Sequence, residues 1–146
     1  MTPDVNVLVA ASRKDHPHHS SANAWLRETL ALAASGGAVR VGLLPMVVSG
    51  FLRVVTNQRV FRDPTPVGSA SEFMRAILDH EGVVVLDLGP ESRALIDLCE
   101  KRGLAAGDVT DAWIAAAVRA HAEHLVTFDR GFRKLLNPAR LTVLEP

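Results

Sequence analysis

The chain has few of the features that mark a secreted, membrane-spanning or strongly basic protein. It contains one cysteine, Cys99, so no disulfide can form within the chain. No signal-like segment is present, and no apolar run reaches the roughly 18 residues typical of a membrane span. The formal net charge is zero, which provides no global attraction for nucleic acid. We therefore expect a cytoplasmic protein that does not enter a membrane.

Length and composition indicate one folded domain. The chain has 146 residues, 48% hydrophobic and 22% charged, which is typical of an ordinary globular protein. No internal repeat or low-complexity segment divides it, so we expect a single domain over residues 1–146. The basic residues are 13 Arg and 3 Lys. Arginine suits phosphate recognition, although a genomic preference for Arg and Ala codons explains the same bias.

Apolar patterning predicts alternating strands and helices in the first half of the chain. Val5–Ala11 is apolar apart from Asn6 and is interpreted as a buried strand end, either short or truncated at its start. A polar segment, Arg13–Ser21, follows, and Ser20 or Ser21 is expected to cap the next helix. The other predicted elements of this half are a strand at 39–44, a helix at 45–55, a surface loop at 57–66 and a helix at 69–80.

The second half continues this alternation. Val83–Leu88 is a nearly continuous apolar run, typical of a strand buried on both faces. A helix at 92–101 is predicted to bury Leu95, Ile96, Leu98 and Cys99 and to end at a glycine stop, Gly103. Beyond it we predict a helix at 111–121 capped by Asp108 or Thr110, a strand at 124–128, a short helix at 130–136 and a strand at 141–144. This order favours an α/β fold whose parallel sheet is covered on both faces.

Four aspartates lie at the ends of these predicted elements. Asp4 adjoins the first strand, and Asp129 follows the strand at 124–128. Asp108 and Asp111 open the helix between them. Open α/β sheets bind ligands at the carboxyl ends of their strands, so these acids are candidates for one site. Buried carboxylates need a cation to offset their desolvation, and oxygen-only ligands favour Mg²⁺ or Mn²⁺.

The two helix acids also have ordinary structural explanations. Asp108 is placed to act only as a cap, and Asp111 in the first turn interacts favourably with the helix dipole. Four aspartates alone are therefore weak evidence for a site. If a metal is bound, phosphodiester hydrolysis fits best, because magnesium held by few carboxylates typically binds phosphate oxygens and activates water.

Three ordered segments resemble the motifs of the PIN-domain family, most closely VapC-type toxins. They are Asp4-Val-Asn-Val-Leu, Thr110-Asp-Ala-Trp-Ile-Ala-Ala and Thr127-Phe-Asp-Arg-Gly-Phe. The segment from Phe51 to Phe61 also resembles a stretch common in one mycobacterial-type subgroup. The resemblance covers nearly the whole chain. It implies a PIN-like three-layer α/β/α fold with a doubly wound central parallel sheet of about four to five strands.

The same resemblance implies a function. It indicates a metal-dependent endoribonuclease toxin of a toxin–antitoxin system, which hydrolyses phosphodiester bonds of tRNA or another structured RNA. The cofactor would be Mg²⁺ or Mn²⁺. The enzyme would act as a homodimer and would be neutralised by a cognate VapB-like antitoxin.

The motif match also assigns roles to individual residues. The catalytic acids would be Asp4, Asp111 and Asp129, and the metal ligands would be Asp4, Asp108, Asp111 and Asp129. Asp108 is the least secure of these, because capping explains it equally well. Asn6 would hold the turn at Asp4, and the Thr127 hydroxyl would support Asp129.

One position departs from the family pattern. Most PIN domains carry a glutamate where this chain reads Ser49-Gly50-Phe51, so only three secure carboxylates are left. Fewer anions favour a single-metal or substrate-assisted site over a two-metal clamp. The departure motivates an alternative, a catalytically weakened PIN-fold module that binds RNA or a protein partner. An aspartate-nucleophile phosphohydrolase is disfavoured, because Asn6 occupies the position of its second aspartate.

Other polar and aromatic residues are assigned plainer roles. The three histidines of the polar segment, His16, His18 and His19, are expected to face solvent and are not included in a metal site. Trp25 and Trp113 are expected in the core or at an interface. The basic residues nearest the acids in sequence are candidates for positioning RNA phosphates, although solvation explains many of them. They are Arg53, Arg59, Arg62, Arg130, Arg133 and Lys134.

Overall fold

Five short parallel strands form the centre of the molecule. The computed structural model describes residues 1–36 and 39–145. Its strands are β1 (Thr2–Pro3), β2 (Val41–Leu43), β3 (Val83–Val85), β4 (Leu125–Thr127) and β5 (Leu141–Val143). β1 pairs with β4, β4 with β5, and β2 with β3, all in parallel. The Gly42 amide donates to the Met1 carbonyl at 3.0 Å and links the two groups of strands, so the order is β3-β2-β1-β4-β5.

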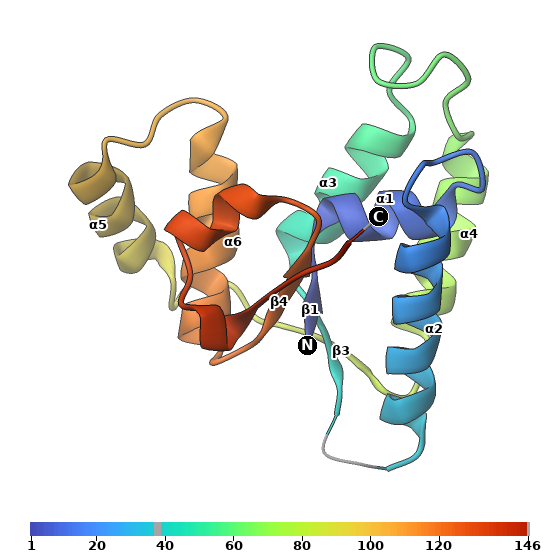
Figure 1. Cartoon of the computed structure of the whole chain (residues 1–146), viewed down its shortest axis with the longest axis horizontal. Coiled ribbons are helices and arrows are strands. Elements are labelled where there is room, and N and C mark those ends of the chain that lie inside the picture. Colours follow the sequence, from blue (N-terminus) through green and yellow to red (C-terminus); the bar gives the residue numbers. More distant parts are fainter. Residues whose placement is uncertain (37–38, 146) are drawn as a thin grey trace.

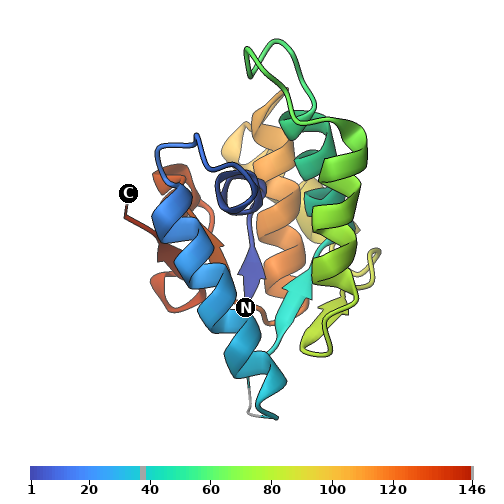
Figure 2. The ribbon, with the colours of Figure 1, turned by 90° about the vertical axis from the view of Figure 1, so that its right-hand side faces the viewer.

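Helices cover both faces of these strands. They are α1 (Val5–Ser12), α2 (His19–Ala34), α3 (Pro45–Val55), α4 (Val67–Leu78), α5 (Ser92–Arg102) and α6 (Asp108–Ala120), with 3₁₀ turns η1 (Arg130–Lys134) and η2 (Pro138–Arg140). α2 and α4 lie on one side and α5 and α6 on the other (Figure 1), and α2 and α4 stand in front of the strands in Figure 2. α1 packs against α2 and α3. The predicted three-layer, doubly wound fold is therefore confirmed.

The direction of winding reverses at the centre of the sheet. The chain moves outward from β1 to β2 and β3, then returns to β4 on the other side of β1 and continues to β5. β1 and β4 are therefore the neighbours at which the strand order switches. In doubly wound folds a crevice opens at this point, outside the carboxyl ends of the two strands.

The segment Val5–Ala11, predicted as a strand end, is instead a helix. β1 is only two residues long, and α1 begins directly after Asp4, which acts as its N-cap. Asp4 Oδ1 accepts a hydrogen bond from the Val5 amide at 2.6 Å. Five consecutive residues of α1, Val7 to Ala11, are buried, so the sequence shows no helical alternation of polar and apolar residues. The uninterrupted apolar run was therefore wrongly predicted as a strand. The prediction that the first strand is short is confirmed, since β1 has two residues.

Two predicted helix caps are also wrong. α2 begins at His19, ahead of Ser20 and Ser21, and no side chain caps it. α6 begins at Asp108, so neither Asp108 nor Thr110 precedes it as a cap. In both helices the serine, threonine or aspartate expected outside the first turn lies within it.

The C-terminal half is less buried than its apolar sequence suggested. β3 pairs only with β2, and Val84 and Val85 of β3 are 37% and 56% exposed. In α5, Ile96 is 65% exposed and only Leu98 is fully buried. A strand at the edge of the sheet has one strand neighbour and fewer helices over it, so the prediction of a strand buried on both faces was wrong.

The hydrophobic core is continuous across the layers. Its largest buried side chains include Phe51 of α3, Ile114 of α6, Leu125 of β4 and Phe132 of η1. Among the described helices, none combines the length and the apolar character needed to cross a membrane.

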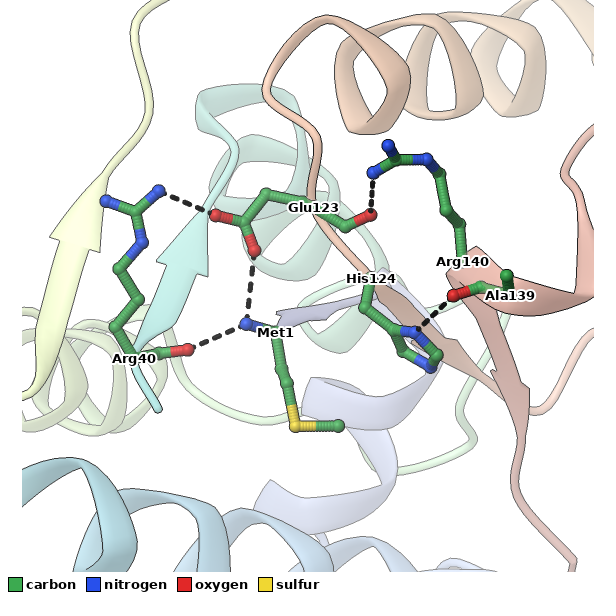
Figure 3. A network of polar contacts seen from close by, with 6 residues as sticks. All are labelled: Met1, Arg40, Glu123, His124, Ala139 and Arg140. Atoms are coloured by element: carbon green, nitrogen blue, oxygen red, sulfur yellow. Dashed lines mark hydrogen bonds and ion pairs between the residues drawn. The ribbon is translucent and has the colours of Figure 1, made fainter. Parts of the chain in front are cut away.

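A polar cluster joins the amino ends of the central strands (Figure 3). Glu123, just before β4, is 7% exposed and accepts hydrogen bonds from the Met1 amine at 3.1 Å and from Arg40 Nη2 at 2.9 Å. Arg140 Nη1 donates to the Glu123 carbonyl at 3.2 Å. Burial acts to raise the pKa of Glu123, but the amine and Arg40 outweigh it and hold the pKa below its usual value. The cluster thus stabilises the fold at neutral pH, and this contribution is lost as the pH falls below about 4.5.

Two helices of the C-terminal half end in the same left-handed turn. α5 ends at Gly103 with φ 63°, as its predicted glycine stop requires, whereas after α6 the equivalent residue is Ala122 with φ 55°. The amide that follows each of them donates to the carbonyl five residues back, at 3.0 Å after α5 and 2.9 Å after α6. This is the Schellman arrangement, which favours glycine because a Cβ is strained at positive φ.

Ala122→Gly is therefore expected to stabilise the protein. Relief of the left-handed strain should raise the free energy of unfolding by about 1 kcal/mol, equivalent to a melting temperature higher by a few degrees. Thermal denaturation followed by circular dichroism measures this. The matched control is Ala120→Gly at the end of the helix itself, which should lower the melting temperature. An equal loss of stability in both variants would show that the turn at Ala122 is unstrained.

Candidate active site

Three of the predicted acids line one cavity. Asp4 follows β1, Asp129 follows β4 after one intervening residue, and Asp111 lies in the first turn of α6. All three contribute to a cavity of about 810 Å³. β1 and β4 are adjacent and parallel, so their carboxyl ends bring Asp4 and Asp129 to the same edge of the sheet. The cavity therefore lies at the point where the winding reverses, where this class of sheet places ligands.

Hydrogen bonds from two neighbouring side chains hold the Asp4 carboxylate. Thr127, at the end of β4, donates from Oγ1 to Asp4 Oδ2 at 2.6 Å, and Asn6 Nδ2 donates to the same oxygen at 2.8 Å. Thr127 Oγ1 also accepts from the Asp129 amide at 2.9 Å, and Asn6 Oδ1 accepts from the Phe128 amide at 3.1 Å. Asn6 and Thr127 therefore link the ends of β1 and β4 and fix the spacing of the two acids.

The electrostatics of the cavity are those of crowded carboxylates. Burial raises the pKa of Asp4, and the nearby charge of Asp129 adds to the effect. Burial, followed by the charges of Asp4, Asp129 and Asp108, raises the pKa of Asp111 to about 6. Among the described residues, the ion pairs involve other acids and leave these three without a cationic partner. The cavity thus carries negative charge that a bound cation would offset.

The donor set fits a hard divalent ion in its chemistry. All three side chains offer carboxylate oxygens, the ligands preferred by Mg²⁺ and Mn²⁺. In the part of the chain that the structure describes, no three His, Cys, Asp or Glu side chains are already gathered closely enough to hold a metal.

Asp108 takes a different position from the other three. It is exposed and lies outside the residues that line the cavity. Its charge still reaches Asp111, because it contributes to the raised pKa of that residue. The structure therefore places Asp108 neither as a cap nor at the cavity wall.

The position without the expected acid has little space for a larger side chain. Gly50 is buried in α3 and lines the cavity beside Ser49. A Cβ built on Gly50 would lie 2.7 Å from Cγ2 of Val5, well inside van der Waals contact. The glycine therefore allows α3 to approach the first residue of α1, next to Asp4. This close approach of the two helices explains glycine at position 50.

Gly50→Ala is expected to destabilise the protein despite the better helix propensity of alanine. Overpacking costs about 1–3 kcal/mol and the propensity gain is about 1 kcal/mol, so the free energy of unfolding should fall by up to about 2 kcal/mol. Chemical denaturation measures the difference. Adding Val5→Ala should restore much of the loss, because it removes the methyl group that clashes. A Gly50→Ala variant as stable as wild type would show that Val5 moves at no cost.

The cavity wall includes groups that sequence reasoning did not place there. Phe61 belongs to the loop predicted at the surface, yet it lines the cavity, with the Arg13 guanidinium 4.0 Å above its ring. Arg13 also donates from Nη1 to Thr65 Oγ1 at 3.0 Å and from Nη2 to Asp15 at 2.6 Å. Buried Arg13 therefore holds the loop at 57–66 in place beside the cavity. No local pattern around Arg13 signals this contact.

One further expectation is corrected by the cavity. His16 was expected to face solvent, but it is half-buried and lines the cavity; His18 and His19 are half-buried as well. Trp113 packs against the hydrophobic core, as expected, and also lines the cavity. Its indole Nε1 donates at 3.0 Å to Glu91, a carboxylate that is only 2% exposed. Of the basic residues considered for phosphate binding, Arg53 lines the cavity.

Comparison with known proteins agrees with this architecture. Residues 1–136 match the PIN domain family. Ribonuclease VapC31 of Mycobacterium tuberculosis (strain CDC 1551 / Oshkosh) is 32% identical over 133 residues, covering 90% of this chain and 89% of the relative. Ribonuclease VapC33 of the same strain is 34% identical over 115 residues, covering 78% and 77%. The chain therefore belongs to the PIN-domain family, and its named relatives here are VapC ribonucleases.

A solved structure shares the same fold. It is the crystal structure of VapBC2 from Rickettsia felis bound to a DNA fragment from the promoter, with a TM-score of 0.68 and 19% sequence identity. The superposition covers 99% of this chain and 98% of the other. At this identity the likeness concerns the fold, so the roles of individual residues here depend on the geometry of this chain.

Proposed function

We propose that the chain is an endoribonuclease toxin that hydrolyses phosphodiester bonds in RNA with the help of Mg²⁺ or Mn²⁺. The observation that carries the proposal is the cavity at the reversal of the sheet, where Asp4, Asp111 and Asp129 meet without a cationic partner among the described residues. The mycobacterial relatives are named ribonucleases, which supports RNA as the substrate. tRNA and other structured RNAs are the first substrates to test.

In this proposal Asp4, Asp111 and Asp129 would hold the ion. When bound, it would supply Lewis-acid activation of the phosphate and of the attacking water. Asn6 and Thr127 keep the Asp4 carboxylate in one orientation through their hydrogen bonds to Oδ2. Arg53 at the cavity wall attracts the RNA backbone. Asp108, outside the wall, adds negative charge that strengthens attraction of the ion.

Partners and location follow from the same proposal. A VapB-like antitoxin would neutralise the enzyme, in keeping with the VapBC2 complex that shares the fold. The toxin would act on cellular RNA in the cytoplasm, as a homodimer. Light scattering of the purified chain tests the dimer, and co-expression with a small neighbouring reading frame tests the antitoxin.

The direct test is cleavage mapping on total cellular RNA. The purified chain should cut RNA at defined positions when Mg²⁺ or Mn²⁺ is present, and a chelator should stop the reaction. Sequencing the new RNA ends identifies the substrate and the bond that is cut. Cleavage that continues unchanged in excess chelator would refute the metal-dependent mechanism.

The second candidate function is a PIN-fold module that binds RNA or a protein with little catalysis. Gly50 motivates it, because a glycine packed against Val5 leaves no room for the usual acid. Titration with Mn²⁺ separates the two functions. An ion that binds only the folded state must raise the melting temperature, so the absence of both a thermal shift and cleavage would favour the binding module.

A further inference from the structure

His16 is a cavity residue whose hydrogen-bonding direction is fixed. It lies in the turn between α1 and α2, where its amide donates to the Arg13 carbonyl at 3.1 Å. Its ring nitrogen Nδ1 accepts a hydrogen bond from the His18 amide at 3.1 Å. A nitrogen that accepts carries no hydrogen, so the hydrogen of the neutral ring must be on Nε2. His16 therefore offers one N–H donor of defined position.

The surroundings of His16 hold the ring in place beside the acids. The ring of His18 lies 5.5 Å from that of His16 and stacks on Phe128 at 4.7 Å, with 21° between the planes. Phe128 directly precedes Asp129, so this aromatic contact ties the histidine turn to the end of β4. Burial, together with the neighbouring His18, lowers the pKa of His16 and favours the neutral ring at pH 7.

The Nε2–H donor of His16 has no hydrogen-bond partner within residues 1–36 and 39–145. His16 lines the same cavity as Asp4, Asp111 and Asp129. It has no place among the metal ligands, which are proposed to be carboxylates. Among the described residues that line the cavity, Arg53 is the one Lys or Arg side chain.

We propose that His16 Nε2–H donates a hydrogen bond to a phosphate oxygen of the RNA strand bound in the cavity, next to the bond that is cut. The proposal rests on the ribonuclease function above and adds a substrate-binding group to it. Because the contact is made to bound RNA before and during reaction, its loss should raise KM more than it lowers kcat. Hydrogen bonds to charged groups are among the stronger ones, so KM should rise about ten- to hundredfold.

The chain supplies a matched control. His80 makes the same local contact, since its Nδ1 accepts from the Gly82 amide at 3.2 Å, but it lies outside the cavity. His16→Phe keeps a ring and removes both nitrogens, and His80→Phe makes the same change at the second turn. His16→Gln retains an N–H donor. We expect KM to rise in His16→Phe, to recover partly in His16→Gln and to be unchanged in His80→Phe.

The phosphate contact itself is tested with modified RNA. The probe is a synthetic RNA that spans a cut mapped with the full wild-type chain, carrying one uncharged methylphosphonate at each linkage next to the cut in turn. At the contacted linkage, the modification should reduce cleavage by the wild-type chain about tenfold. It should reduce cleavage by His16→Phe much less, because that variant has already lost the contact. Equal penalties in both proteins at every linkage would overturn the phosphate contact.

The outcomes separate this inference from the proposed function. If the wild-type chain cuts RNA and His16→Phe has the same KM, only the role of His16 is refuted. If the wild-type chain cuts no RNA with either ion, the ribonuclease proposal and the role of His16 both fail. Circular dichroism of each variant shows whether it is folded, so that a raised KM can be separated from unfolding. His80→Phe shows the effect of losing the same type of local contact at a position outside the cavity.

Discussion

Asp4→Asn is expected to reduce RNA cleavage at least about a hundredfold while leaving the fold intact, because the lost metal contact is worth several kcal/mol in the transition state. Asparagine has the shape of aspartate but lacks its charge. Its one amide oxygen can replace either Oδ2, which accepts from Thr127 and Asn6 at 2.6 and 2.8 Å, or Oδ1, which accepts from the Val5 amide at 2.6 Å. Cleavage of a mapped RNA site under single-turnover conditions measures the loss.

Stability should change much less than activity. The pKa of Asp4 is raised by burial, so the folded chain holds this carboxylate charge at a cost. The neutral amide removes that cost but gives up one set of the hydrogen bonds to Asp4, so the free energy of unfolding should fall by no more than about 1 kcal/mol. A large loss of cleavage with a small change in stability is the result expected for a catalytic acid rather than a structural one.

Asp108→Asn is the matched control for this experiment. It makes the same chemical change at an exposed position outside the cavity wall, three residues from Asp111. Cleavage should stay near the wild-type rate. If Asp4→Asn cuts RNA as fast as wild type, Asp4 has no part in the mechanism. If Asp108→Asn is as inactive as Asp4→Asn, the site extends beyond the cavity wall.

The sequence predicted best where the signal is local. Alternating strands and helices gave the α/β class, and carboxylates at strand ends pointed to Asp4 and Asp129, because parallel strands direct their carboxyl ends to one edge. The resemblance to PIN domains supplied the strand number and the layers. The glycine stop at Gly103 was predicted from one residue, since a left-handed helix end favours glycine.

The sequence predicted least where burial or distant contacts decide the structure. α1 is buried along most of its length, so its apolar residues lack helical spacing and resemble a strand. The cavity wall depends on Arg13 reaching Phe61, 48 positions along the chain, and Thr65 beyond it. His16 looked solvent-exposed among polar neighbours, because nothing local shows that His18 stacks on Phe128. Such contacts depend on the completed fold.

Without a divalent ion, the chain is expected to become less stable as the pH rises through about 6. The pKa of Asp111 is about 6 in the folded chain, above its ordinary value of 3.8. Between these values the folded state keeps a proton that the unfolded state has released, so the free energy of unfolding falls with rising pH. The raised pKa of Asp4 acts in the same direction. For the partly exposed Asp111, solvent screening reduces the expected change to about 1–2 kcal/mol.

Chemical denaturation in chelator, from pH ~4 to ~7, measures this slope. Asp111→Asn should flatten the slope, because the asparagine has no proton to lose. Asp108→Asn should keep most of the wild-type slope. Added Mn²⁺ should reverse the trend in the wild type, since a metal ion takes the place of the proton and its stabilising effect grows as the carboxylates ionise. An unchanged slope in Asp111→Asn would assign the pH dependence to other groups, and an unchanged curve with Mn²⁺ would remove the ion from the cavity.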